Sequence, residues 1–304
     1  MTSLLDRPLK PRRISGVSLR RRVADKTATV LVTLSMVLTL IPLVWVLYTV
    51  VSNGLKMVGS SVWWTHSQAG MTAFAPGGGV YHAIVGTVAQ GLVCSAISIP
   101  IGVFVAIYLV EYGAGTRLGK LATFMVDILT GVPSIVAALF IYAMWVATLG
   151  FDRSGFAVAL SLVLLMIPVI VRSAEEMFRI VPVDLREASY ALGVAKWKTI
   201  VRIVIPTALS GIITGIMLAL ARVMGETAPL LVLVGYSQAM NFDMFDGFMG
   251  SLTGMMYDQT SAGAGTSAVP SDRLWGAALT LILLIALLNI VARLGARIFA
   301  PKKF

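Results

Sequence analysis

Residues 181–206 read VPVDLREASYALGVAKWKTIVRIVIP, a partly polar stretch that separates two long apolar runs. Asp184 can cap a helix N-terminus, and Glu187 three residues later completes an acidic version of the capping box. Gly193 can end that helix, because glycine tolerates the left-handed conformation found after many helices. The stretch therefore predicts a short helix held between two membrane spans.

One face of this short helix is narrow and made of small and apolar residues. Leu185, Ala188, Ser189 and Leu192 recur at the spacing i, i+3, i+4, i+7, which puts them on one side of a helix. Such a face fits a groove on another protein. A second amphipathic stretch then leads to Pro206, which is acceptable in the first turn of the next helix because that position needs no amide donor.

The composition places the rest of the chain in a membrane. Of the 304 residues 58% are apolar and 12% charged, and the mean hydropathy is +0.89, so there is more apolar surface than a soluble core could bury. We expect an all-α, polytopic membrane helix bundle, with a basic tail at 1–27, a transmembrane domain at 28–298 and a short tail at 299–304. Apolar stretches long enough to span a bilayer lie at 28–51, 81–109, 121–149, 155–173, 207–235 and 274–298.

The Lys and Arg residues predict the orientation and argue against a nucleic-acid partner, although the net charge is +10. They lie beside the apolar runs rather than on a folded basic face, and basic residues near short loops stay on the cytoplasmic side. Both termini are therefore predicted to be cytoplasmic, with the first run retained as an anchor. The basic residues between the fourth and fifth runs are Arg172, Arg179, Arg186, Lys196, Lys198 and Arg202, and only Lys56, Arg153, Arg222 and Arg273 fall elsewhere than inside.

Cysteine and tryptophan residues are given ordinary structural roles. Cys94 is the single cysteine and lies in an apolar run, which removes any disulfide framework and predicts a packing residue. Trp63 and Trp64 lie in the loop after the first run, where tryptophans usually anchor a protein at the membrane interface.

A family resemblance rests on the quoted stretch. Glu187-Ala188-Ser189, then Gly193, then Ile203-Val204-Ile205-Pro206 resembles the EAA loop of ATP-binding-cassette importer permeases, whose pattern is EAA, three residues, Gly, nine residues and I-x-L-P. The spacing is kept throughout, and only Ser189 and Ile205 depart from the pattern. The resemblance implies a type I (MetI-like) permease whose loop 174–206 carries a coupling helix for a cytoplasmic ATPase dimer. Its coupling residues would be Asp184, Leu185, Glu187, Ala188, Ser189, Leu192, Gly193 and Pro206.

ATP hydrolysis is not expected of this chain. It has no GxxxxGK[ST] loop to hold nucleotide phosphates, so it is interpreted as a permease subunit without catalytic residues, metal or bound cofactor. ATP and magnesium would then bind to the partner ATPase. The importer class also implies a binding protein on the extracytoplasmic side.

Charged residues within an apolar span are costly, and the fifth run contains Arg222 and Glu226. Four residues apart, they share a helix face and can pair, which would make the burial of each tolerable. A guanidinium facing a pathway could also attract a multiply charged anion. The residues alone leave two roles open for Arg222 and Glu226. They could line or gate a pathway, or they could form a purely structural ion pair.

A second resemblance favours the pathway. Arg222-x-x-Gly225-Glu226-Thr227-Ala228-Pro229 is similar to the R-x-x-GET-A segment of phosphate-specific permeases, and residues 131–134 and 167–177 are also similar to the A-type subunits (PstA) of those importers. This implies transport of inorganic phosphate by a heterodimer with a homologous C-type permease, fed by a phosphate-binding protein at the cytoplasmic membrane of a bacterium or archaeon. The implied pathway residues are Arg222, Glu226, Thr227 and Arg172, with a positive-inside anchor as the alternative for Arg172.

Four further residues in the apolar runs can break a helix or pair two helices. Gly131, Pro133 and Pro168 lie where they would loosen a helix, and Asp127 is expected to pair structurally more than to act in transport. Rival functions are a permease for another oxyanion, a gradient-driven transporter with Glu226 and Asp127 as proton carriers, and a membrane scaffold.

Overall fold

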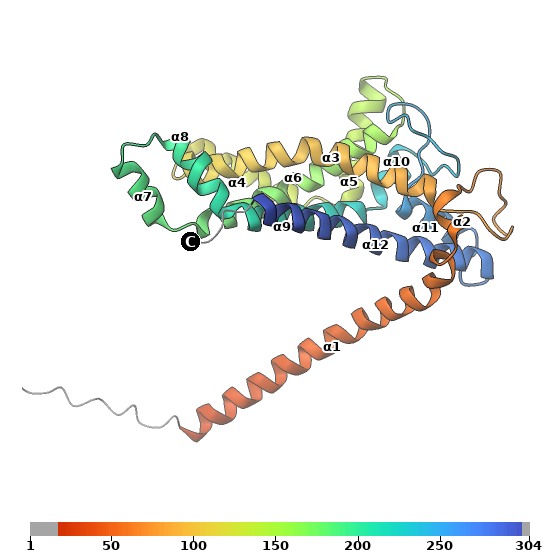
Figure 1. Cartoon of the computed structure of the whole chain (residues 1–304), viewed down its shortest axis with the longest axis horizontal. Helices are drawn as coiled ribbons and strands as arrows, with labels where there is room; N and C mark the ends of the chain where they lie inside the picture. Colours follow the sequence, from red (N-terminus) through yellow and green to blue (C-terminus); the bar gives the residue numbers. More distant parts are fainter. Residues whose placement is uncertain (1–17, 300–304) are drawn as a thin grey trace, which may run out of the picture. The chain divides into compact units, whose positions relative to one another are not determined.

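The computed structural model describes residues 18–299 as helices joined by loops, with no β-strand in this range (Figure 1). Most of the predicted basic tail, 1–27, and residues 300–304 of the C-terminal tail lie outside the described residues. The α-helices are α1 (Leu19–Val58), α2 (Ser61–Thr65), α3 (Tyr81–Ile107), α4 (Arg117–Thr130), α5 (Ser134–Ile141), α6 (Gly155–Ile180), α7 (Val183–Ala191), α8 (Lys196–Thr199), α9 (Ile205–Met224), α10 (Ala228–Leu233), α11 (Leu252–Ser261) and α12 (Ala268–Phe299), with π-helical turns η1 (Tyr108–Tyr112), η2 (Tyr142–Thr148) and η3 (Ile200–Val204).

Helix α1 crosses the boundary between two compact units, which divide after Thr49. From Thr27 to Thr49 this helix carries no charged residue, and its most apolar 18-residue window has a mean hydropathy of 2.5. A helix that is apolar on all sides is typical of a membrane span. The predicted helix at 28–51 is therefore confirmed.

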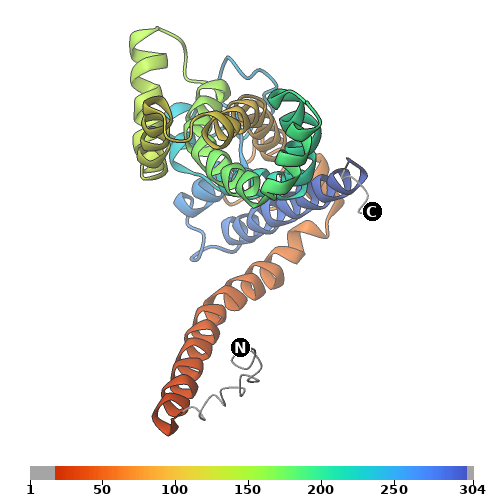
Figure 2. The ribbon, with the colours of Figure 1, turned by 90° about the vertical axis from the view of Figure 1, so that its left-hand side faces the viewer.

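The second unit is a bundle built around α6. In Figures 1 and 2, α3, α6, α9 and α12 run alongside one another, with α6 packed against both α3 and α9. In the apolar window of α6, 67% of the residues are buried, against 28% in each of α3, α9 and α12. Cys94 of α3 is buried there with its Sγ 3.5 Å from Sδ of Met166, so its role as a packing residue is confirmed.

The third predicted span, 121–149, is not one helix. The backbone bends by 106° between α4 and the segment formed by α5 and η2, so residues 18–299 contain five helices able to span a membrane, or six if the bent pair counts as one span. Pro133 has no amide to donate and disfavours helix at Val132, and Gly131 caps α4. A break at Gly131 and Pro133 is thus confirmed, whereas α6 continues through Pro168.

The fifth predicted span, 207–235, has different bounds. Helical backbone runs from Lys196 to Met224 and includes the π turn η3, after which a break precedes α10. Gly225 caps α9, and Pro229 lies in the first turn of α10, where a missing amide is tolerated. The span therefore begins earlier and ends earlier than its hydropathy suggests.

Helix α11 lies in a segment that the sequence analysis leaves as loop. The Oγ atom of Ser251 accepts a hydrogen bond from the Gly254 amide (3.0 Å) and so caps the helix. Leu252 and Met255 are fully buried one turn later. Ser251 followed by apolar residues at helical spacing was a usable signal for this helix.

Trp63 is not a membrane-interface anchor. Its side chain is 0% exposed, and its Nε1 donates to Oγ1 of Thr280 in α12 (3.0 Å). Only Trp64 is exposed, with its Nε1 bonded to the Val58 carbonyl (2.8 Å). The anchor prediction is wrong for Trp63 because packing against α12, more than 200 residues away, buries it.

The Arg273 side chain binds the loop between α2 and α3 through hydrogen bonds. It is 1% exposed, and its nitrogens donate to the carbonyl oxygens of Thr72, Ala73, Ala75 and Gly77 at 2.7–3.4 Å. A buried charge is tolerated when hydrogen bonds satisfy it. This residue therefore fastens the loop to the first turns of α12.

A buried hydrogen-bonded chain joins three segments at the same end of the bundle. The Tyr236 hydroxyl donates to Oε1 of Gln68 (3.0 Å), so Nε2 of His82 must donate to the same hydroxyl (2.8 Å). Burial and the nearby charge of Asp258 raise the pKa of Tyr236, which keeps the phenol protonated as a donor. The chain ties the loop before α3, α3 itself and the segment before α11 together.

Close contact between α3 and the segment before α11 gives a stability prediction. A Cβ on Gly86 would overlap the carbonyl oxygen of Gly250, whereas a Cβ on Gly91 of the same helix would meet nothing closer than Cδ1 of Leu220 at 3.7 Å. We expect Gly86→Ala to lose about 1–3 kcal/mol of stability through overpacking. Gly91→Ala should be neutral or slightly stabilising, since alanine favours helix by up to about 1 kcal/mol over glycine. Thermal unfolding of both variants in detergent checks this, and equal midpoints would contradict it.

Candidate functional site: a loop helix and the charged groups of the bundle

Helix α7 lies between α6 and α9 at one end of the bundle, opposite α2 and α11 (Figure 1). It begins one residue before Asp184, so Asp184 lies in the first turn and the predicted cap at this residue is wrong; Pro182 occupies the cap position. Gly193 has φ +72°, its amide donates to the Tyr190 carbonyl (2.9 Å), and the Val194 amide donates to that of Ser189 (3.2 Å). These two bonds form a Schellman motif, so the predicted ending at Gly193 is confirmed.

Most of the predicted docking residues of α7 are exposed. Leu192 is 83% exposed and Leu185 42%, and Ala188 is exposed on the same side. Ser189 is the exception, at 4%, because its Oγ makes a 2.8 Å hydrogen bond with Oγ1 of Thr199 in α8. The exposed surface of α7 therefore excludes Ser189, and its further members are Asp184, Glu187, Tyr190 and Ala191.

Arg186 points the other way and joins α7 to the bundle. Its guanidinium pairs with Oε1 of Glu111 in η1 (3.1 Å) and donates to the carbonyls of Val181 and Phe178 (2.8 Å each). The two charged side chains are 13% and 6% exposed, so water screens the pair little. Lys196 adds a hydrogen bond to the Glu111 carbonyl, which makes η1 the attachment point for both sides of the loop.

From the sequence, Arg186 is predicted only to be one of the basic residues on the inside, and Glu111 has no predicted role. The partners are 75 residues apart, so no local spacing links them. A glutamate at the end of a long apolar run was the one available signal.

Breaking this buried pair should loosen α7. Removing one partner leaves an uncompensated buried charge, which costs about 3–5 kcal/mol. We expect Glu111→Gln and Arg186→Gln each to lower the thermal unfolding midpoint and to speed hydrogen exchange in residues 183–199. Arg202→Gln is the matched control, because Arg202 is exposed and has no ion pair in the described part of the chain. Unchanged exchange in both variants would refute the attachment.

Pro206, the last predicted coupling residue, lies in the first turn of α9 as expected. The preceding turn, η3, is π-helical. A π turn is one way to continue a helix where an amide donor is missing. The chain between α7 and α9 is therefore helical over most of its length.

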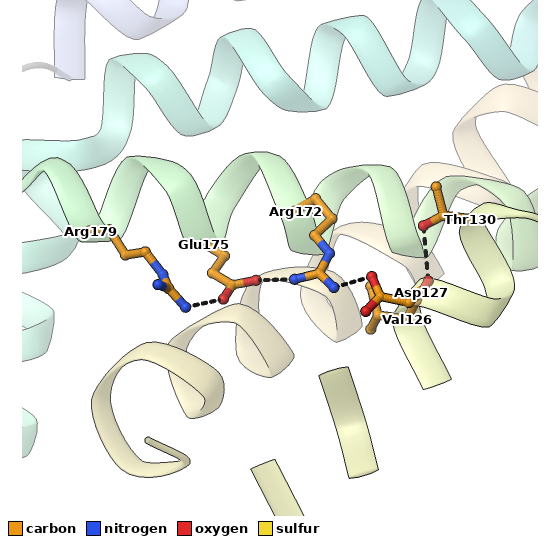
Figure 3. A network of polar contacts seen from close by, with 6 residues as sticks. All are labelled: Val126, Asp127, Thr130, Arg172, Glu175 and Arg179. Carbon is orange, nitrogen blue, oxygen red and sulfur yellow. Dashed lines mark hydrogen bonds and ion pairs between the residues drawn. The ribbon is translucent and has the colours of Figure 1, made fainter. Parts of the chain in front are cut away.

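Arg172 lies between two carboxylates in a row of four charged residues (Figure 3). It pairs with Asp127 of α4 and, through Nη1, with Oε2 of Glu175 (2.9 Å); Oε1 of Glu175 accepts from Nη2 of Arg179 (2.6 Å). The predicted structural pairing of Asp127 is confirmed. Since both its carboxylate neighbours neutralise it, Arg172 is not a free cation, and it braces α4 against α6 instead.

The predicted pair between Arg222 and Glu226 is not formed. The helix ends at Met224, so the two side chains no longer share a helical face, and no ion pair joins them. Arg222 is exposed, and its side chain makes no hydrogen bond or ion pair within the described residues; Glu226 and Thr227 are partly exposed. Thr207, Ser210, Thr214 and Leu218 are also exposed on α9, at spacings that place them on the same face as Arg222.

Metal binding has no support in the described residues 18–299. No three His, Cys, Asp or Glu side chains there lie close enough together to hold an ion.

Comparison with known proteins gives close relatives over nearly the whole chain. Residues 98–304 match the family model described as binding-protein-dependent transport system inner membrane component. The chain is 54% identical to phosphate transport system permease protein PstA 1 of Mycobacterium tuberculosis (strain ATCC 25618 / H37Rv), over 95% of this chain and 92% of that protein. It is 36% identical to phosphate transport system permease protein PstA of Yersinia pestis, over 93% and 92%.

Two solved structures share the fold at low sequence identity. The inward-facing MetNI methionine ABC transporter matches with a TM-score of 0.57 at 18% identity, over 73% of this chain and 94% of that chain. A bacterial ABC transporter involved in the import of the acidic polysaccharide alginate matches with a TM-score of 0.58 at 14% identity, over 91% and 98%.

Proposed function

The chain belongs to the family of binding-protein-dependent transport system inner membrane components, and we propose that it is the PstA-type permease subunit of an ATP-driven importer of inorganic phosphate. The all-α type I importer fold predicted from the sequence is confirmed by the family match and the structural neighbours. Members of this family are integral membrane proteins that work with a separate ATPase and a substrate-binding protein. The chain is therefore a permease and not an enzyme.

The observation that carries this proposal is the placement of α7. This helix exposes Leu185, Glu187 and Leu192 while Arg186 fastens it to the end of α3 through Glu111. A rigid helix with an exposed apolar and acidic surface, attached to a membrane-spanning segment, can pass a push from a docked partner to that segment. We infer that a cytoplasmic ATPase dimer binds this surface and that ATP and magnesium bind there, on the partner.

Basic residues support the orientation. The elements that meet at the α7 end of the bundle are the start of α4, the end of α6, and α8 with the turn η3 that follows it (Figure 1); they carry Arg117, Lys120, Arg179, Lys196, Lys198 and Arg202. Lys56, Arg153, Arg222 and Arg273 belong to the opposite helix ends: the last turn of α1, the loop before α6, the last turn of α9 and the first turns of α12. We infer that the α7 end faces the cytoplasm, that both termini are cytoplasmic, and that the membrane is the cytoplasmic membrane of a bacterium or archaeon.

Arg222 supports an anion pathway along α9. An exposed guanidinium with no partner among residues 18–299 would be costly against lipid. We therefore infer that a second permease, the homologous C-type subunit, covers this face. Arg222, Glu226 and Thr227 would then line the outer part of a pathway between the two subunits.

The proposed cycle uses these parts in order. A phosphate-binding protein delivers its anion to the end of the bundle that carries α2 and α11, where Arg222 attracts it and Glu226 limits how tightly it is held. Closure of the ATPase dimer moves α7, and the Arg186–Glu111 pair carries that movement into α3. No bond in the phosphate changes.

Uptake of labelled phosphate tests the function. The complete complex, with its binding protein, is reconstituted in proteoliposomes that contain ATP, an ATP-regenerating system and, in parallel, a protonophore. We expect uptake that needs ATP and persists when the proton gradient collapses. Uptake that survives loss of ATP but fails without the gradient would establish the secondary transporter. Equal competition by excess sulfate or molybdate would favour a permease for another oxyanion.

A further inference from the structure

A cavity of about 530 Å³ opens between the end of α3, the start of α4 and the last turns of α6. It lies apart from the exposed surface of α7 and from the α9 face that carries Arg222. Its polar walls come from α4 and α6, and its apolar walls from η1 and α4. Residues that line it include Val110, Gly115, Lys120, Thr123, Asp127 and Arg179.

The charged side chains at this cavity are all paired within the described residues except that of Lys120. Asp127 and Glu175 are the carboxylates of the row in Figure 3, and Arg172 and Arg179 are its guanidinium groups, so these four balance. Lys120 lines the same cavity and is exposed, and its side chain makes no hydrogen bond or ion pair with the rest of the described chain. Lys120 is therefore a cation of the cavity lining whose side chain no described residue pairs.

The rim of the cavity is apolar. Phe124 lines it, and the neighbouring outer surface of α4 is a continuous band of exposed apolar side chains. In a membrane protein such a band contacts lipid acyl chains. Its members are Leu118, Leu121, Phe124, Met125 and Ile128, each 44–60% exposed.

We propose that this cavity binds the phosphate-containing headgroup of an anionic phospholipid. The phosphodiester lies at Lys120, the acyl chains lie along α4, and Oδ2 of Asp127, which the pair with Arg172 leaves free, accepts from headgroup hydroxyls. Basic pockets at the cytoplasmic ends of membrane helices suit such headgroups. A lipid in this place would bridge α4 and α6 beside the row of four charges.

Inorganic phosphate offers the same anionic oxygens and has to be separated from lipid. The apolar walls and rim favour lipid, because a free ion gains nothing from them and acyl chains do. Zwitterionic lipid would satisfy the rim but would bring no net negative charge to Lys120. The test therefore compares anionic lipid, zwitterionic lipid and inorganic phosphate.

The test counts lipid molecules retained by the purified complex in native mass spectrometry, after incubation with phosphatidylglycerol or with phosphatidylcholine. We expect phosphatidylglycerol to be retained preferentially, and Lys120→Gln to weaken that retention about fivefold, the effect of one basic residue near a lipid surface. Arg117→Gln is the matched control: Arg117 starts the same helix, is exposed and does not line the cavity. It should keep nearly all the retention.

Two further measurements test whether the ligand binds in this cavity and whether it is lipid or free phosphate. Thr123→Trp fills the cavity without changing charge, and we expect it to abolish retention with an unchanged unfolding midpoint. Millimolar inorganic phosphate should leave the retained lipid unchanged; displacement of lipid by phosphate would assign the cavity to the free ion. Equal retention in Lys120→Gln and Arg117→Gln would overturn the proposal. Because the readout is bound lipid, it does not depend on whether phosphate is the transported substrate.

Discussion

Phosphate uptake should fall to background in Glu187→Lys, while the membrane helices stay folded. Glu187 is exposed on α7 and has no partner within the described residues, so nothing in this chain depends on its charge. On a docked ATPase the lysine would face the groups that bind the Glu187 carboxylate in the parent protein. Disrupting an interfacial charge pair costs about 2–5 kcal/mol, which weakens binding by roughly 30-fold or more.

Two measurements on Glu187→Lys separate docking from folding. Copurification of the ATPase should be lost, and the thermal unfolding midpoint of the isolated permease should stay within experimental error of the parent. Glu176→Lys is the control, since Glu176 is also exposed and unpaired in the described range but lies on α6. Normal uptake in Glu187→Lys, or an equal loss in Glu176→Lys, would remove α7 as the coupling element.

The second large effect is expected for Arg222→Ala. The Arg222 side chain makes no hydrogen bond or ion pair within the described chain, so its loss should leave folding and assembly intact. If it attracts the anion, uptake should drop about tenfold or more, because a charge-assisted hydrogen bond contributes about 1.5–3 kcal/mol. Uptake in Arg222→Lys should be intermediate between that of the parent and that of Arg222→Ala, since an ammonium keeps the charge but not the planar pair of donors.

Arg172→Ala provides the contrast for Arg222→Ala. Arg172 is paired on both sides, and its removal leaves Asp127 and Glu175 unbalanced, so the unfolding midpoint should fall together with uptake. If Arg222→Ala instead prevents assembly with the second permease while Arg172→Ala does not, Arg222 is an interface residue and the pathway assignment fails.

Sequence predicted the features that depend on neighbours along the chain. The apolar runs predicted membrane helices because burial of apolar surface depends on composition, and Gly193 predicted the end of α7 because left-handed backbone favours glycine. Even locally, errors arose where two signals competed. Asp184 has the chemistry of a cap, yet α7 starts one residue earlier at Val183.

Features that depend on distant residues were missed. The spacing of Arg222 and Glu226 suggested a pair only on the assumption of unbroken helix, and the helix stops between them. Glu111 and Arg186 form a buried pair across 75 residues, and Trp63 is buried by α12 rather than exposed at the membrane interface. Periodicity carries no information about which helices become neighbours.

Arg273 grips the loop between α2 and α3 through carbonyl oxygens, which every amino acid possesses. These hydrogen bonds therefore do not depend on the side chains of Thr72, Ala73 and Ala75. Substitutions at these three positions could therefore adapt the loop to another docking protein without removing the bonds to Arg273, whereas Gln68, Gly77 and Gly79 are fixed by their own contacts and backbone.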